Sequence, residues 1–419
     1  MTATGVTHAP GYVVVEDGKI RELGAGQGPE VAGARSIDGS GMWLTPGLID
    51  THSHLGVYPS PDLAAHGDGN EATAPTTPGV WAEHSLWPQD PGFQRAIEGG
   101  ITALQVLPGS ANLVGGRGVV VEVVPARGSR AMRFPGAPET VKMACGENPK
   151  RVYGEKGGPG TRMGNLRGQR EAFLGAEAYL HKWQEYGRKE VSWQERTAAG
   201  RKKEPAGERP TPPDRDLDQE TLAGILVGRF LPQVHCYRAD DMLSFLQVAD
   251  EFGFEVRSFH HALEAYKIRD VLAERSVAVS TWADWWGFKI EAYDGIPENL
   301  GLVHEAGGLA VTHSDSAIGI QRLNQETGKA LAAARAAGIE ITDDEALRWI
   351  TANPAWTLGI DAMTGTIAPG KRADLVLWDH QPLSVYASAR SVWVAGILRW
   401  DAENPEIWSD YLIGQEVGP

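Results

Sequence analysis

Two histidines stand one residue apart at the end of an apolar segment, in the sequence GLIDTHSHLG (residues 47–56). Side chains alternate between the two faces of a β-strand, so His52 and His54 point to the same side and lie close enough to share one ion. Neutral imidazole is a ligand that zinc and similar divalent metals accept. The pair therefore indicates a metal site, although two solvent-exposed histidines beyond a strand would need no ligand.

Histidines and an aspartate also stand at the ends of three later strand-like segments. These residues are His235, His260 with His261, and His313 with Asp315. One such strand end is a weak indication of a metal site, whereas four together are a strong one. We expect these side chains to converge on one centre.

Eight short apolar segments alternate with helical patterns between about residues 43 and 359, which is typical of βα units around a parallel sheet. The segments are residues 43–50, 101–107, 118–124, 139–145, 231–237, 254–259, 276–281 and 308–313. Eight units predict an α/β fold of the (β/α)8 TIM barrel type, in which reactive residues lie at the C-terminal ends of the strands. That architecture would bring the histidines together.

The two ends of the chain follow a different pattern. Residues 11–24 and 365–400 alternate apolar and polar residues between Gly and Pro turns, as antiparallel strands do. We therefore predict one small β-sandwich domain built from residues 1–45 and 360–419. Residues 46–359 would form the barrel.

Residues 157–220 interrupt the alternation of strands and helices. They begin with GGPGTRMG, continue through an aromatic and charged helical pattern, and end in the proline-rich RKKEPAGERPTPPDRD. A connection of this length is usually functional or partly disordered. We predict an insertion over one barrel face, with a lid of one or two helices followed by a mobile linker.

These motifs together resemble a known family. GLIDTHSHLG, the later histidines and the SDS at residues 314–316 strongly resemble the metal-dependent amidohydrolases, in particular their imidazolonepropionase-related branch. The closing TANPAWTLGI and GTIAPGKRADLVLWD are similar to the usual end of that family, where the chain leaves the barrel. The resemblance covers residues 11–400 apart from the insertion. It implies hydrolysis of a C–N bond, in an amide, cyclic amide or peptide-like group of a small substrate.

The resemblance also implies a site for one or two divalent metal ions, with zinc as the expected metal. The implied ligands are His52, His54 and Asp315 for the first ion, and His235 and His261 for the second. His261 is preferred over His260 because the HALEAYK that begins at His261 is similar to the family sequence H-A-T-E-A-Y-K. His260 is then expected in the wall of the site, as a packing residue or beside the substrate.

Two neighbouring cations need an anion between them, because a bridging carboxylate relieves their repulsion. The fourth strand-like segment offers Lys142, which in related barrels is carboxylated to a carbamate, and Glu147 near its end. Burial would lower the pKa of Lys142 toward the neutral amine that carbamate formation requires. Lys142 is slightly preferred, and Glu147 remains the alternative. Without a metal, Lys142 would form an ordinary salt bridge.

Asp315 is the expected catalytic residue. Its carboxylate can accept a proton from the attacking water and pass it to the leaving amine, acting as general base and then as general acid. The structural alternative is a helix N-cap, which the SDSAIG context would also allow.

Two further residues are candidates for substrate contact. Deaminases that resemble this barrel carry the pattern H-x-x-E at the fifth strand. Arg238 stands at the position of that glutamate, three residues after His235, and the missing glutamate argues against deamination of a nucleobase. Arg238 could hold a substrate carboxylate, or it could pair with Asp240 or Asp241. Asn112, in LPGSANLVGGRG (residues 107–118), could approach the substrate or belong to a tight structural turn. A barrel that binds metal or ligand without turnover is the alternative to an enzyme, but it should have lost at least one ligand.

The composition agrees with an acidic globular enzyme. The chain has 419 residues, 42% of them hydrophobic, which suffices for a large domain and a small one. The net charge of -15 and pI near 5.3 argue against a nucleic-acid partner. No leader or membrane span is visible, so we expect a cytoplasmic protein with a small-molecule substrate, and homo-oligomerisation is left open. Cys145 and Cys236 cannot make a disulfide framework and are expected to serve packing.

Overall fold

The largest sheet of the computed structural model, which describes residues 1–198 and 207–408, has eight strands in chain order. They are β4 (Leu48–Ser53), β5 (Ile101–Val106), β6 (Val114–Glu122), β7 (Thr140–Ala144), β8 (Leu231–Cys236), β9 (Ser258–His261), β10 (Ala278–Thr281) and β11 (Leu309–Thr312). The two outer strands approach each other where the backbone N–H of Asp315 donates to the carbonyl of His52 at 3.0 Å. The sheet is therefore a nearly closed barrel, and the predicted fold class is confirmed.

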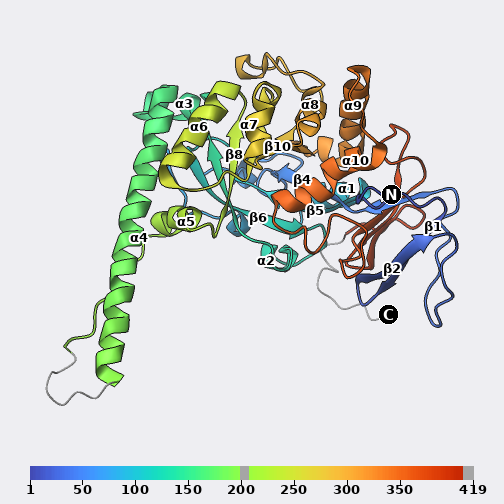
Figure 1. Ribbon diagram of the computed structural model, residues 1–419, viewed down its shortest axis with the longest axis horizontal. Helices are drawn as coiled ribbons and strands as arrows, with labels where there is room; N and C mark the ends of the chain where they lie inside the picture. The colour runs from blue at the N-terminus through green and yellow to red at the C-terminus, as the bar shows by residue number, and fades with distance from the viewer. Residues whose placement is uncertain (199–206, 409–419) are drawn as a thin grey trace.

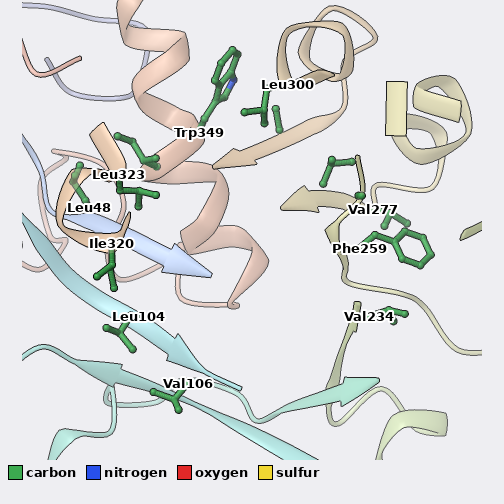
Figure 2. Close-up of a cluster of buried hydrophobic side chains, with 14 of the residues drawn as sticks. Leu48, Leu104, Val106, Val234, Phe259, Val277, Leu300, Ile320, Leu323 and Trp349 are labelled. Carbon is green, nitrogen blue, oxygen red and sulfur yellow. The ribbon is translucent and has the colours of Figure 1, made fainter. Parts of the chain in front are cut away.

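Helices pack around this sheet (Figure 1). The α-helices are α1 (Pro91–Glu98), α2 (Ser129–Met132), α3 (Glu147–Tyr153), α4 (Arg162–Ala198), α5 (Leu217–Leu226), α6 (Ala239–Phe252), α7 (Arg269–Glu274), α8 (Asn299–Glu305), α9 (Leu323–Ala336), α10 (Asp343–Leu347) and α11 (Ala352–Thr357). Single 3-10 turns are η1 (Ala64–His66), η2 (Ala82–His84), η3 (Gly154–Lys156), η4 (Ala265–Ile268), η5 (Ile290–Ala292), η6 (Gly319–Arg322) and η7 (Arg348–Ile350). Figure 2 shows apolar side chains that strands and helices contribute to the core, among them Phe259, Leu300 and Trp349. Burial of this apolar surface holds the strand ends in place.

The sheet is not wholly parallel, which corrects the sequence-based expectation. β6 runs antiparallel to both β5 and β7, whereas the other neighbouring strands of the barrel are parallel. Only residues 107–113 connect β5 to β6. A parallel connection needs a crossover of about a dozen residues or more, so this short loop can only return the chain in the opposite direction.

Strands from both ends of the chain form the smaller sheets. β3 (Trp43–Pro46) pairs antiparallel with β12 (Leu375–Trp378), and β13 (Ala389–Val394) and β14 (Ile397–Asp401) continue that sheet. β1 (Gly11–Glu16) and β2 (Lys19–Ala25) form a separate hairpin. Buried Ile20 of the hairpin packs with Leu375 of the four-stranded sheet. Residues 409–419 of the predicted small domain lie outside the described residues.

The insertion contains one helix of 37 residues, α4, which extends well beyond the barrel (Figure 1). Its buried side chains, which include Gln169 and Phe173, all lie in its first half. The second half points away from the barrel in this view, and the role of the insertion as a lid stays a prediction. Residues 199–206 of the predicted linker lie outside the described part of the chain. No helix within residues 1–198 and 207–408 combines the length and apolarity that crossing a membrane requires.

Cys145 and Cys236 form a disulfide, with their Cα atoms 5.3 Å apart. This bond corrects the prediction that the two cysteines serve packing alone. They lie at the ends of the parallel neighbours β7 and β8, where Ala144 pairs with His235. The register of the two strands therefore brings the thiols together, although 91 positions separate them in the sequence.

Candidate metal centre

Imidazoles and one carboxylate converge at the C-terminal ends of the barrel strands. Their potential ligand atoms lie within 4.8 Å of one another in each of two groups. One group is His52, His261 and His313, and the other is His52, His54 and Asp315. Neutral imidazoles and a carboxylate are the donors that zinc and related divalent ions accept. The donor set of this chain therefore fits a divalent metal.

A hydrogen-bonded chain orients His52. Nε2 of His260 lies 2.7 Å from Oε1 of Gln233, an oxygen that only accepts, so this nitrogen carries the proton. Nδ1 of a neutral His260 must then accept, and Nδ1–H of His52 donates to it at 3.0 Å. The Nε2 lone pair of His52 consequently faces the centre, where Nζ of Lys142 contacts it at 3.3 Å. Such a partner behind the ring is typical of metal-ligating histidines.

His54 is oriented in the same way by the loop after β5. Its Nδ1–H donates to the backbone carbonyl of Leu107 at 2.8 Å, which directs Nε2 toward the centre, 3.2 Å from Oδ1 of Asp315. The segment that follows is fixed by Asp90, whose carboxylate caps α1 and accepts the backbone N–H of Gly56. Gly56 has a φ of 78°, a conformation that side chains other than glycine rarely adopt.

Three buried histidines have ring nitrogens without hydrogen-bond partners within the described residues. These atoms are Nδ1 of His235, Nδ1 of His261 and both nitrogens of His313. Leaving such an atom unpaired costs about 1–3 kcal/mol, so a ligand that satisfies it is the natural explanation. Burial lowers the pKa of all three, that of His313 to about 3, and the rings are therefore neutral and able to bind a metal.

The predicted second pair of ligands lies next to this cluster. The ring centroids of His235 and His261 are 4.5 Å apart, and Nδ1 of His261 is 3.9 Å from Oδ2 of Asp315. His235 belongs to neither of the two close groups in the described chain. The assignment of two separate ion sites stays a prediction.

Lys142 and Glu147, the two candidates for a bridging anion, occupy different places. Lys142 is buried, and its Nζ lies 3.3 Å from Nε2 of His52. Burial lowers the pKa of Lys142 to about 8, so a reactive neutral amine is accessible. Glu147 begins α3 at the rim, where its carboxylate lies 3.4 Å from Nζ of Lys289. Of the two, Lys142 is the one placed among the imidazoles.

The backbone holds Asp315 in an uncommon conformation. Its φ is 45°, in the left-handed region, and non-glycine residues adopt such values mostly where the surrounding structure enforces them. The buried carboxylate of Asp50 supplies that constraint by accepting hydrogen bonds from the backbone N–H and the hydroxyl of Ser314. Burial would raise the pKa of Asp315, but contacts with His54, His313 and Lys142 lower it below its ordinary value. Asp315 is therefore a carboxylate at neutral pH.

The three candidates for substrate contact, Arg238, Asn112 and His260, have protein partners in the structure. These contacts match the structural alternatives considered from the sequence, and contact with a substrate stays a prediction. Arg238 forms a two-pronged ion pair with Asp240 at 2.8–2.9 Å and is substantially exposed. Nδ2 of buried Asn112 contacts two backbone carbonyls and the hydroxyls of Thr77 and Tyr153. Asn112 thus connects the loop after β5 to residues 71–77 and to the end of α3. Both ring nitrogens of His260 are engaged as described above, and its side chain is inaccessible.

Three further side chains contact the centre, and they are His313, Gln233 and Trp282. His313 directly follows β11, and that position was the available signal for it. Gln233 lies two residues before His235 on the same face of β8, but its contact with His260 depends on the pairing of β8 with β9. Trp282 stacks on His261 with ring centroids 4.6 Å apart. No local pattern indicates such a contact between strands.

Similarity to known proteins agrees with this geometry. Residues 299–398 match a model described as the amidohydrolase family. The chain is also similar to the crystal structure of an amidohydrolase from Thermotoga maritima MSB8, with 32% identity, a TM-score of 0.79, and coverage of 93% of this chain and 94% of that one. The chain belongs to the metal-dependent amidohydrolases.

Two relatives of this amidohydrolase match it in sequence over very different lengths. Amidohydrolase tasK of Hapsidospora irregularis is 34% identical over 409 residues, which cover 93% of the chain and 40% of the relative. The chain thus spans about two fifths of the length of that protein. An imidazolonepropionase of Ralstonia nicotianae is 54% identical over 48 residues, or 11% of the chain. So short a match leaves the imidazolonepropionase-related branch a prediction.

A more distant structure shares the fold. The adenosine deaminase of Xanthomonas campestris, solved with bound zinc, has a TM-score of 0.55 and 15% identity, with coverage of 98% of this chain and 93% of that one. At this level of identity the likeness concerns the barrel architecture alone. Activities vary widely on one barrel, so the site residues must carry the functional conclusion.

Proposed function

We propose that this amidohydrolase hydrolyses a C–N bond of a small molecule, in an amide, cyclic amide or peptide-like group. The observation that carries the proposal is the cluster of His52, His54, His261, His313 and Asp315, whose potential ligand atoms approach within 4.8 Å in two overlapping groups. Imidazoles without protein partners, gathered at the end of a barrel where enzymes of this architecture react, support a metal-dependent reaction better than a structural role.

Zinc is the proposed metal, held by this cluster with His235 as a further ligand. A divalent metal in such a site lowers the pKa of water and polarises a carbonyl group. Gln233, through His260, and Leu107 orient His52 and His54 so that their Nε2 atoms point toward the centre. Lys142, as a carbamate, is the proposed bridge if two ions bind, because its amine lies beside His52.

Asp315 is the proposed catalytic residue. Its carboxylate is ionised, lies against Nε2 of His54 and remains partly accessible at 24% side-chain exposure. It can take a proton from the attacking water and give it to the departing nitrogen, and proton transfer by a positioned side chain commonly contributes about 10²–10⁴-fold to the rate. The backbone of Ser314, anchored by Asp50, fixes the position of this carboxylate.

Deamination is the second candidate reaction, because some relatives carry deaminase names. Arg238 occupies the position where the H-x-x-E pattern would supply a proton donor, and it pairs with Asp240. Amide hydrolysis is therefore favoured. The predicted cytoplasmic location stays a prediction, and the disulfide between Cys145 and Cys236 does not favour it, since such bonds are rare in reducing compartments.

The test combines metal analysis with an activity screen on the purified full chain. We expect one or two equivalents of zinc, turnover of at least one member of a library of N-acyl amino acids, dipeptides and cyclic amides, and loss of turnover after chelation with recovery when zinc returns. Full activity in protein stripped of metal would refute the proposal. Release of ammonia from nucleosides or bases, without amide cleavage, would favour the second candidate.

A further inference from the structure

A row of aromatic rings leads from the metal centre toward the surface. The indole of Trp282, which is buried, stacks on His261 with centroids 4.6 Å apart and planes 21° apart. Trp285 stacks in turn on Trp282, at 5.1 Å and 14°. Trp285 is 40% exposed, so the outer end of this stack is open.

A second branch of rings reaches the same surface. Tyr237 stacks on His261 at 5.0 Å and 20°, and Phe288 lies 6.2 Å from Tyr237 in an edge contact. Phe288 also lies 6.2 Å from Trp282, the ring on which Trp285 stacks. Phe288 is 57% exposed. The two exposed rings are thus both in contact with the buried rings that line His261.

So much exposed apolar surface at one place calls for an explanation. Besides Trp285 and Phe288, the same segment exposes Trp286, Ile290 and Tyr293. Contiguous apolar patches on a protein surface usually mark a site of interaction. This patch adjoins the strand ends that carry the metal ligands, where a small substrate must bind.

Hydrogen bonds and ion pairs hold the segment in place. The backbone N–H of Gly287 donates to the carbonyl of Ala292 at 2.8 Å. Buried Glu291 pairs with Arg162 at the start of α4 and with Lys289. These contacts fix the backbone on both sides of Phe288, so the exposed rings of the segment are held in defined positions.

Lys289 anchors this segment and also lies over the ring of Tyr237. Protein carboxylates already neutralise its charge. Nζ of Lys289 lies 3.9 Å from the Tyr237 ring centroid, 3.4 Å from Glu147 and 3.5 Å from Glu291. Two carboxylates beside one ammonium leave no surplus positive charge for an anionic substrate group. Recognition at this part of the mouth therefore depends on the rings.

We propose that Trp285 and Phe288 form an aromatic subsite that binds a flat ring of the substrate beside the bond to be cleaved. The inference rests on the proposed hydrolase function and narrows its substrates to N-acyl or N-aminoacyl compounds with an aromatic group. Trp285 is linked to the ligand His261 through the stacked ring of Trp282, so the subsite is separated from the metal centre by one ring. Stacked or edge-on aromatic pairs gain stability beyond the burial of their area, so an aromatic ring is preferred over an aliphatic group of similar size.

The test compares three dipeptides or N-acetyl amino acids that differ in one side chain: phenylalanine, cyclohexylalanine and alanine. For the zinc-loaded full chain we expect kcat/KM to be ~10-fold or more higher for the phenylalanine compound than for the alanine compound, with cyclohexylalanine between them. The Trp285→Ala, Phe288→Ala double variant should lose most of that preference, mainly through KM. Its kcat/KM for the alanine compound should fall by a clearly smaller factor than its kcat/KM for the phenylalanine compound.

Matched variants separate binding from folding. Tyr386→Ala removes an aromatic ring that is 76% exposed after β12 and should leave all three values unchanged. Trp285→Leu and Phe288→Leu keep apolar volume at the subsite and should still reduce the preference for phenylalanine over cyclohexylalanine. An equal loss for all three compounds, or no preference in the unmodified chain, would overturn the subsite.

Direct binding distinguishes failure of the subsite from failure of the hydrolase function. N-acetylphenylalanine amide and N-acetylalanine amide are titrated calorimetrically into the full chain after its metal has been removed by chelation, so that no turnover occurs. Tighter binding of the phenylalanine compound that Trp285→Ala abolishes would support the subsite even if no compound is cleaved. Cleavage of all compounds without aromatic preference would support the hydrolase and refute the subsite. Absence of binding here together with absence of turnover across the whole library would refute both.

Discussion

Two clusters of buried polar side chains differ in how far the protein satisfies them. At the barrel mouth, neither ring nitrogen of His313 has a hydrogen-bond partner within the described residues. Where the barrel meets the small sheet, the carboxylate of Asp374 accepts hydrogen bonds from Thr364 and from the backbone of Ala395, both at 2.8 Å, and pairs with Arg372 at 3.2 Å. The imidazole nitrogens of the first cluster thus have no partner among the described residues, whereas the charged groups of the second cluster form ion pairs with one another.

The difference distinguishes buried polar groups that stabilise the fold from those that are available to a ligand. Arg372 also pairs with Glu122 at 2.6 Å and lies over the ring of Phe134, so its charge is compensated on several sides. Charges compensated in this way hold two parts of a protein together, and breaking them costs stability. Unpaired imidazoles cost stability where they stand and point to a bound ligand. Substitutions in the two clusters should therefore affect different measurements.

The largest effect is expected for Asp315→Asn. Its amide cannot take up the proton from water, so kcat should fall by ~10³-fold or more, whereas the melting temperature should change little. Initial rates on the best substrate and a thermal unfolding curve check this. The control Asp284→Asn alters an exposed carboxylate that pairs with Lys329, and it should retain activity. Comparable rates in Asp315→Asn and the unmodified chain would show that Asp315 is not catalytic.

Asp374→Ala should give the opposite pattern. Removal of one partner leaves Arg372 and two donors without the buried carboxylate, which is expected to lower the free energy of unfolding by about 3–5 kcal/mol. Urea unfolding measures this change, and kcat of the folded fraction should stay within about twofold. Asp361→Ala, at an exposed position nearby in the sequence, serves as control and should change stability by less than about 0.5 kcal/mol. If Asp374→Ala reduced kcat without loss of stability, the distinction between the clusters would fail.

The neighbours His260 and His261 sharpen the comparison within the barrel mouth. His261→Asn should lower the metal content by one equivalent, because Nδ1 of His261 is free for a ligand. His260→Asn should retain metal but bind it ~10–100-fold more weakly, since the hydrogen-bonded support of His52 is disturbed. Metal analysis and competition with a chelator distinguish these results. The reverse order of effects would make His260 the ligand.

The smallest effect concerns the pH dependence of stability. Burial raises the pKa of Glu122, and the nearby Arg372 only partly offsets this. A carboxyl group with a raised folded-state pKa binds its proton more tightly when folded, so its stabilising contribution is complete below the unfolded pKa of about 4.5 and is lost as the pH rises through the folded value. Glu122→Gln should therefore show a smaller loss of unfolding free energy than the unmodified chain between pH 4.5 and 8. Parallel urea-unfolding profiles would contradict this expectation.

The strand ends were largely predictable from sequence because the signal is local. An apolar segment followed by His52 and His54, or by His313 and Asp315, shows both the strand and the polar residue that ends it. The direction of β6 was also encoded, in the shortness of residues 107–113, but it was not recognised.

Contacts between strands were not predictable, because they depend on register. The bond between Cys145 and Cys236 requires the pairing of β7 with β8, and the contact of Gln233 with His260 requires that of β8 with β9. The straight course of α4 has a similar reason. A charged helical pattern indicates a helix, but not whether its second half folds back over the barrel or extends from it.

The disulfide makes the whole excursion that contains α4 a covalent ring. Proteolysis within the outer half of α4 should yield two pieces that migrate as one band until a reducing agent separates them. The disulfide also links β7 to β8 directly, so the alignment of these two strands does not depend on the outer half of α4. The disulfide should therefore keep the strand ends at the barrel mouth in place even after the 37-residue helix α4 has been cut in its outer half.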